Sequence, residues 1–184
     1  MRKIFIIALL VALSLPATAL AQEKRKGEVA ANFTWSHSNF QDVLTYRPIG
    51  VMVEGTGYVN EWFGITGEFG WGTGTGDLDI FWLPIEVNID TMTFMGGARF
   101  RFANNSRVTP SLRAVGGGLN AKASYVGFPD TETETGFSMA FGGAIDIDIT
   151  ERAAIRVQPD FITFWLDGTN DSMFRISFGG VFGF

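Results

Sequence analysis

The segment 174–184 reads FRISFGGVFGF, and its residues alternate in character with a period of two. Side chains of a β-strand point alternately to opposite faces, so every second residue shares a face. One face then carries Phe174, Ile176, Phe178, Gly180, Phe182 and Phe184. The other face carries Arg175, Ser177, Gly179, Val181 and Gly183. Because an aromatic face this continuous would promote aggregation in water, the segment predicts a strand whose outer face contacts lipid.

This strand resembles the C-terminal strand of bacterial outer-membrane β-barrels, in which a final aromatic residue is read by the assembly machinery. The resemblance implies that Phe184 is an assembly signal and that the outer-membrane assembly machinery is a partner. The alternative is a terminal strand buried inside a soluble β-sandwich.

Residues 1–21, MRKIFIIALLVALSLPATALA, have the three parts of a secretory signal peptide. Arg2 and Lys3 give a positive start, residues 4–15 form an apolar core, and residues 19–21 form a small-x-small cleavage site. The core is short for a membrane-spanning helix. We therefore predict a signal peptide at 1–21 and a mature domain at 22–184, with a retained N-terminal anchor as the alternative.

Composition limits the remaining classes. The chain has 184 residues and no cysteine, which excludes disulfides and a lipoprotein anchor. Removal of Arg2 and Lys3 from the 14 basic residues leaves 12 against 19 acidic residues, a net charge of −7. This charge argues against nucleic acid as a partner. Abundant glycine and phenylalanine in alternating patterns indicate an all-β chain.

Eight segments of the chain have the alternation of β-strands. They are residues 28–37, 49–59, 63–71, 91–102, 108–120, 136–148, 153–164 and 174–184. Pro110 and Pro159 cannot donate hydrogen bonds to a ladder, so we expect a bulge or a strand end near each.

The connections between these strands alternate in length. Those after the second, fourth and sixth strands are short, and the longer ones are residues 38–48, 72–90, 121–135 and 165–172. A transmembrane barrel with short periplasmic turns and long external loops has this rhythm. We therefore predict a closed antiparallel transmembrane β-barrel of about eight strands at 22–184.

The hairpin 58–69, YVNEWFGITGEF, is similar to the second hairpin of OmpA-like transmembrane domains and opacity-type surface antigens. The signal peptide, the strand count and Phe184 agree with the same superfamily of small outer-membrane barrels. The resemblance implies a fold and a location in the outer membrane of a Gram-negative bacterium. Because no peptidoglycan-binding domain follows the barrel, we do not expect the tethering role of longer relatives.

The predicted inward face carries many charged residues. One of them, Arg101, lies near a strand end. We predict a lumen charge network of Glu54, Glu68, Arg99, Arg113, Asp146, Arg156, Asp160 and Arg175. An eight-stranded barrel is just wide enough for its side chains to fill it, and buried charges must pair. The network would therefore close the lumen. A narrow ion path is the alternative, and the pairing of individual charges stays open.

His37 is the single histidine, and it lies between Ser36 and Ser38 at the predicted outer end of a strand. One interpretation is a lipid A-modifying enzyme, because lipid A palmitoyltransferase and deacylase barrels carry a histidine and a serine near the outer leaflet. In such an enzyme, Asp77 or Asp79 of this chain would orient the imidazole of His37. The simpler interpretation is a polar residue at the membrane rim. We expect no enzyme, catalytic residue, cofactor or metal site.

The predicted external loops are acidic. Arg47 and Lys122 stand against Asp42, Asp77, Asp79, Glu86, Asp90, Asp130, Glu132, Glu134, Asp167 and Asp171. Divalent cations bridging these carboxylates to lipopolysaccharide phosphates are one interpretation, since hard cations prefer oxygen ligands. A solvated loop surface is the simpler one.

These features together predict a structural or surface barrel for envelope integrity or surface interaction. We expect a monomer with outer-membrane lipids, including lipopolysaccharide, as its surroundings. A small channel and a lipid A-modifying enzyme are the alternatives.

Overall fold

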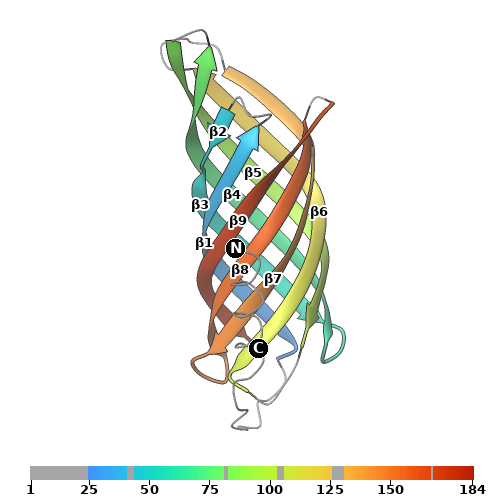
Figure 1. Ribbon diagram of the computed structural model, residues 1–184. Coiled ribbons are helices and arrows are strands. Elements are labelled where there is room, and N and C mark those ends of the chain that lie inside the picture. Colours follow the sequence, from blue (N-terminus) through green and yellow to red (C-terminus); the bar gives the residue numbers. More distant parts are fainter. Residues whose placement is uncertain (1–24, 41–43, 81–82, 103–105, 126–130, 167) are drawn as a thin grey trace, which may run out of the picture.

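The computed structural model describes residues 25–40, 44–80, 83–102, 106–125, 131–166 and 168–184. These residues form one closed barrel of tilted antiparallel strands (Figure 1). The predicted signal peptide at 1–21 lies outside the described residues, so it stays a prediction. Within the described ranges, no helix has the length and apolar character needed to span a membrane.

Nine strand segments make up the wall. They are β1 (Gly27–Phe40), β2 (Leu44–Tyr46), β3 (Ile49–Tyr58), β4 (Phe63–Ile80), β5 (Leu83–Arg101), β6 (Val108–Tyr125), β7 (Thr131–Asp148), β8 (Ala153–Leu166) and β9 (Thr169–Gly183). Consecutive segments pair from β3 to β9, and β9 pairs with β1, which closes the sheet. We call the end with the short connections and with Arg25 and Phe184 the turn end, and the opposite end the loop end.

Segments β2 and β3 are two parts of one strand. Both pair with β1 in a single register, in which Ser38 faces Tyr46 and Trp35 faces Ile49. Both also pair with β4 in a single register. The interruption falls at Pro48, which has no N–H to donate to a ladder. The barrel is therefore eight-stranded, which confirms the predicted fold class.

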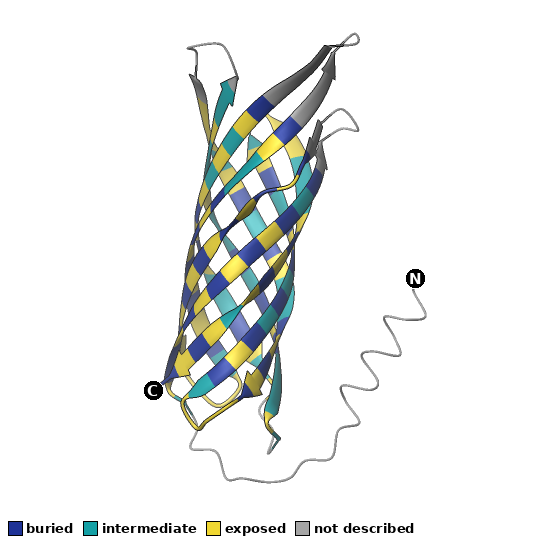
Figure 2. Ribbon diagram, turned by 90° about the vertical axis from the view of Figure 1, so that its left-hand side faces the viewer, coloured by how far each residue is buried: buried dark blue, intermediate teal, exposed yellow. Residues whose placement is uncertain are grey.

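Burial alternates along the strands (Figure 2). The buried inner face carries charged, polar and apolar side chains, whereas the exposed outer face is rich in large apolar side chains. On β9, the inward Ser177 is 0% exposed, whereas its outward neighbour Phe178 is 57% exposed. The outward Phe94 of β5 reaches 74%. Large apolar side chains so exposed over a whole barrel surface fit a hydrocarbon environment and would be unfavourable in water. The face assignments predicted from period-two alternation are confirmed.

The strands at the loop end are longer than predicted. Most of the expected connections 72–90, 121–135 and 165–172 belong to β4, β5, β6, β7, β8 and β9. Thr73 pairs with Asp90, and Lys122 with Thr133, well beyond the apolar part of each strand. Outside the lipid both faces of a strand carry polar residues, so the alternation that identifies a half-buried strand is lost.

Pro159 interrupts pairing with β7 without shifting the register, whereas Pro110 stays within the β6–β7 ladder opposite Ile145. Gly142 pairs with Asp160 and Ile145 with Val157, which is the same register on both sides of Pro159. The bulge considered for this position is therefore absent from the described ladder. Pro110 lies near the start of β6, as expected for a residue that cannot donate.

The barrel closes at the turn end through Gly27 and Phe184. The amide of Phe184 donates to the Gly27 carbonyl at 2.9 Å, and the Phe184 carbonyl accepts from the amides of Lys26 and Gly27 at 2.9 and 3.0 Å. The phenyl ring lies over Gly27, where a Cβ would come within 2.6 Å of a ring carbon. Phe184 therefore has a structural role at the seam as well as an exposed ring.

The outward position of Phe141 on β7 generates a test of the membrane-facing surface. An arginine at the middle of the lipid-facing band should cost about 2–4 kcal/mol. We expect Phe141→Arg to reduce folding into lipid vesicles strongly. Thr133→Arg is the matched control, because Thr133 lies on the same strand and face but beyond the apolar band. Equal folding yields of the two variants, measured by heat-modifiable gel mobility, would contradict a position of Phe141 in the lipid-facing band.

Candidate functional site: the charged lumen

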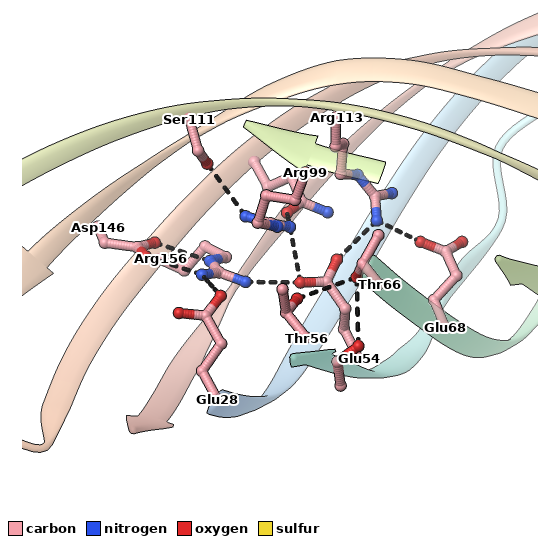
Figure 3. Close-up of polar contacts among 12 residues, drawn as sticks. Glu28, Glu54, Thr56, Thr66, Glu68, Arg99, Ser111, Arg113, Asp146 and Arg156 are labelled. Carbon is pink, nitrogen blue, oxygen red and sulfur yellow. Dashed lines mark hydrogen bonds and ion pairs between the residues drawn. The ribbon is translucent and has the colours of Figure 1, made fainter. Parts of the chain in front are cut away.

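Nine charged side chains of the described strands form one connected network inside the barrel. Figure 3 labels all of them except Asp160 and Arg175. We call it the lumen network; its members are Glu28, Glu54, Glu68, Arg99, Arg113, Asp146, Arg156, Asp160 and Arg175. All of them are buried. The strands supply these side chains from their inward faces. The period-two pattern therefore determines which charged residues enter the lumen.

Glu54 of β3 is the centre of this network. Its Oε1 accepts from Arg99 Nη2 and from Arg156 Nη1, each at 2.6 Å. Its Oε2 accepts from Arg113 Nη1, also at 2.6 Å. One carboxylate therefore contacts three guanidinium groups, which stand on β5, β6 and β8. Charge-assisted hydrogen bonds of this length are the strong class in proteins.

Arg156 extends the network toward the turn end. Its Nη2 donates to Glu28 Oε1 at 2.5 Å and to Asp146 Oδ2 at 2.7 Å, and its Nε donates to Asp146 Oδ1 at 2.7 Å. The bond to Asp146 is therefore bidentate, the geometry that suits a planar guanidinium. Through this contact, Glu28 on β1 is linked to β8, which is distant from it along the chain.

Asp160 and Glu68 extend the network on its other side. Arg113 donates to both oxygens of Asp160 at 2.9 Å and forms an ion pair with Glu68 at 2.5 Å. Arg175 contacts Asp160 and Glu68 through its Nη2 at 3.0 Å each. These contacts connect β4, β6, β8 and β9.

Neighbouring strands place like charges beside each other in this network. Glu54 faces Glu68 across the β3–β4 ladder, and Arg99 faces Arg113 across the β5–β6 ladder. Like charges directly opposite each other destabilise a strand pair. Here the two arginines reach the two glutamates across the lumen, so the repulsion within each ladder is offset only in the closed barrel.

Apolar side chains fill the lumen on the loop side of this network. This upper apolar cluster consists of Met95, Val115, Leu119, Ala140, Ile162 and Phe164. A cavity of about 40 Å³ beside Arg175 is lined partly by Thr34, Ser36, Thr91 and Thr93. It has room for a few water molecules at most. The lumen is thus packed above the network and ion-paired within it.

All eight charges predicted for the lumen point inward, and the structure brings them into this one network. Glu28 was missed, although its parity with Ala30 and Asn32 on β1 marks it as inward. Arg101 stays apart from the network at the turn end, with its guanidinium 3.8 Å from the centre of the Tyr58 ring. Arg25, which the sequence analysis did not single out, forms an ion pair with Asp148 there at 2.6 Å.

The candidate catalytic residues near the loop end lie on different faces of β1. Ser36 and Ser38 are buried and inward, and the Ser38 hydroxyl donates to the Ser172 carbonyl at 2.9 Å. His37 points outward and stacks on Trp35, with ring centroids 6.3 Å apart. Neither adjacent hydroxyl therefore faces the imidazole. The side chains of Asp77 and Asp79 lie outside the described residues.

The acidic residues predicted for the external loops are only partly described. Asp42, Asp130 and Asp167 lie outside the described residues, as do the side chains of Glu86 and Glu132. Asp90 faces Lys122 on the β5–β6 ladder. Across the described ranges, no group of three or more His, Cys, Asp or Glu side chains has the arrangement to hold a metal ion.

Comparisons with known proteins agree with this geometry. A family model for the outer membrane protein β-barrel domain matches residues 5–182. The structure is similar to Neisserial surface protein A, with a TM-score of 0.64 and 13% identity over 86% of this chain and 97% of that one. It is also similar to Ail, the attachment invasion locus protein of Yersinia pestis, with a TM-score of 0.54 and 16% identity over 85% of this chain and 99% of that one.

A third similar structure is the outer membrane protein OprG from Pseudomonas aeruginosa, with a TM-score of 0.53 and 9% identity. It covers 88% of this chain and 97% of that one. Identities this low show a shared fold and nothing finer. No curated protein matches the chain.

The three guanidinium contacts of Glu54 generate a prediction about stability. Glu54→Gln leaves three buried cations short of one negative charge, and breaking a buried ion pair from one side costs about 3–5 kcal/mol. We expect a large loss in the free energy of unfolding, measured by urea titration in lipid vesicles. Glu151→Gln makes the same chemical change on an exposed turn and should cost less than about 1 kcal/mol. Similar losses in the two variants would contradict a central role for Glu54.

Proposed function

The chain belongs to the outer membrane protein β-barrel family, and from this we propose that it is a closed-lumen barrel that supports the envelope and presents external loops. The observation that carries the proposal is the lumen network, in which buried ion pairs cross-link non-adjacent strands. A conducting pore needs a continuous aqueous path, and eight-stranded barrels have little interior space to begin with. The upper apolar cluster adds a second obstruction.

The proposal favours a surface or structural role over catalysis. An envelope barrel needs a wall that is stable in lipid and a polar loop surface. This chain has many exposed apolar side chains on its wall and many acidic residues in its predicted external segments. The hypothesis of a lipid A-modifying enzyme loses its simplest Ser-His pair, because Ser36 and Ser38 face the lumen while His37 faces outward. Outer-membrane lipids, including lipopolysaccharide, are the expected surroundings of a barrel that acts as a monomer.

A ligand is not transferred from the similar structures. Ail has been solved in complex with the heparin analogue sucrose octasulfate. The predicted external segments of the present chain have a large excess of Asp and Glu over Lys and Arg. Such a surface repels polyanions at long range, so we propose no sulfated polymer as its ligand.

Conductance measurements test the closed lumen. We expect purified protein to give no stable single-channel currents in planar lipid bilayers, because the ion pairs and the upper apolar cluster block the interior. A heat-unfolded sample of the same preparation controls for detergent artefacts. Reproducible large currents from the folded protein would contradict the closed barrel and favour the channel alternative.

The assembly signal predicted at Phe184 has its own test. Phe184→Ala removes the ring but keeps the backbone hydrogen bonds to Lys26 and Gly27, so closure in detergent should be nearly intact. We expect a severalfold decrease of folded protein in the outer-membrane fraction of cells. Phe182→Ala is the control, because Phe182 is an exposed phenylalanine on the same face of β9. Equal outer-membrane levels of both variants would exclude a special role for Phe184.

A further inference from the structure

Two cationic or hydrogen-bond-donating side chains, His37 and Arg47, face each other at the loop end of the wall. His37 lies on β1, and Arg47 lies between β2 and β3. Ser38 pairs with Tyr46 and Trp35 with Ile49, so the register sets His37 opposite Arg47. Residues opposite each other on neighbouring antiparallel strands have Cβ atoms about 5 Å apart. The two side chains can therefore contact one common group.

Both side chains stand on the outer face of the wall. Arg47 is exposed between the buried Tyr46 and Pro48, and His37 lies between the buried Ser36 and Ser38. They are the first polar outward residues after the apolar series that ends with Trp35 on β1 and Ile49 on β3. In a transmembrane barrel, that position coincides with the level of the lipid headgroups.

Apolar rings hold the imidazole in place. The His37 and Trp35 rings are stacked, with an interplanar angle of 8°. On the other side, His37 faces the exposed Phe174 of β9. The imidazole therefore lies beside aromatic residues at the end of the apolar outer surface.

The charge of Arg47 is available to a ligand as far as the described residues go, because none of them forms an ion pair with it. Thr75 is the residue of β4 opposite Arg47 in the shared register, and Asp77 is the next outward residue. The side chain of Asp77 lies outside the described residues. Lys122, in contrast, is directly opposite Asp90. Neither basic residue forms an ion pair with a described side chain, but a carboxylate lies directly opposite Lys122, whereas a hydroxyl lies opposite Arg47 on β4.

We propose that His37 and Arg47 form a binding site for a phosphate group of an outer-leaflet lipid. The inference rests on the proposed function, because it requires the barrel to span the outer membrane. A guanidinium binds phosphate oxygens in a fork geometry, and a neighbouring imidazole N–H supplies a further donor. The acyl chains of the same lipid would lie along Trp35, Ile49 and the apolar residues below them. The site thus joins a phosphate contact to an apolar surface in the order in which a lipid presents them.

The test measures lipid binding to the intact barrel in a neutral detergent, with EDTA present to remove divalent cations. Diphosphoryl lipid A is the probe, and native mass spectrometry gives the fraction of protein that carries it. We expect Arg47→Gln to weaken binding about fivefold, the effect of roughly 1 kcal/mol for an exposed charge contact. Adding His37→Gln should weaken it further.

Lys122→Gln is the matched control, because it removes one positive charge from the same rim. It should change binding by less than about twofold, since Asp90 already faces Lys122. Equal losses in Arg47→Gln and Lys122→Gln would overturn the site and indicate general electrostatic attraction. Unchanged binding in Arg47→Gln would also overturn it.

Two further probes identify the source of the phosphate. Dephosphorylated lipid A should bind to the wild-type barrel and to Arg47→Gln equally, and inorganic phosphate at millimolar concentration should not displace diphosphoryl lipid A. Displacement by inorganic phosphate would overturn the assignment to a lipid. These outcomes do not depend on the lumen. A conducting barrel that still binds lipid A at His37 and Arg47 would contradict only the closed lumen, and a closed barrel that does not bind it there would contradict only the phosphate site. Heat-modifiable mobility confirms that each variant is folded.

Discussion

Buried charge that must be paired within the barrel is the constraint on which the rest of this structure depends. The lumen network places five carboxylates and four guanidiniums in an interior from which bulk water is largely excluded. An ion left unpaired there costs several kcal/mol, whereas well-paired ions with additional hydrogen bonds are tolerated. Glu54 contacts three arginines and Arg113 contacts three carboxylates, whereas Arg99, Glu28 and Asp146 each have one oppositely charged partner.

The route of these contacts couples them to closure of the sheet. Asp146–Arg156 and Asp160–Arg175 join strands that are neighbours in the ladder. All the other ion pairs of the lumen network join strands that are not neighbours, such as β3 with β8 and β4 with β9. The like-charged neighbours Glu54–Glu68 and Arg99–Arg113 are unfavourable in an isolated hairpin. The interior therefore favours the complete barrel over its partly assembled sheets, since the opposite charges on non-adjacent strands come together when the sheet curves and closes.

The outer face of the barrel, in contrast to the lumen, is selected for contact with lipid. Large apolar side chains cover it because lipid, unlike water, carries no penalty for contact with them. Where this surface ends at the loop end, the pattern changes within a few residues to polar strands that continue to pair. The outer rim is thus the place where the wall meets both hydrocarbon and headgroups, and His37 beside Arg47 belongs to this boundary.

Local alternation was enough to predict the apolar parts of the strands and their inward and outward faces, and the alternating lengths of the connections predicted the closed barrel. A period of two is a property of each strand alone, and the apolar series on β9 and the charges at Glu54, Arg113 and Asp160 were readable from it. The same rule marks Glu28 as inward, because it shares the parity of Ala30 and Asn32 on β1.

Pairing between the charges depended on the tertiary structure, because partners such as Arg156 and Glu28 are joined only by the tilt and closure of the wall. The interruption at Pro48, which leaves β2 and β3 in one register, and the polar strand extensions of β4 and β5 were likewise decided by ladder pairing. Sequence alternation reports which face a side chain occupies, whereas only the closed sheet determines which strand lies opposite that face.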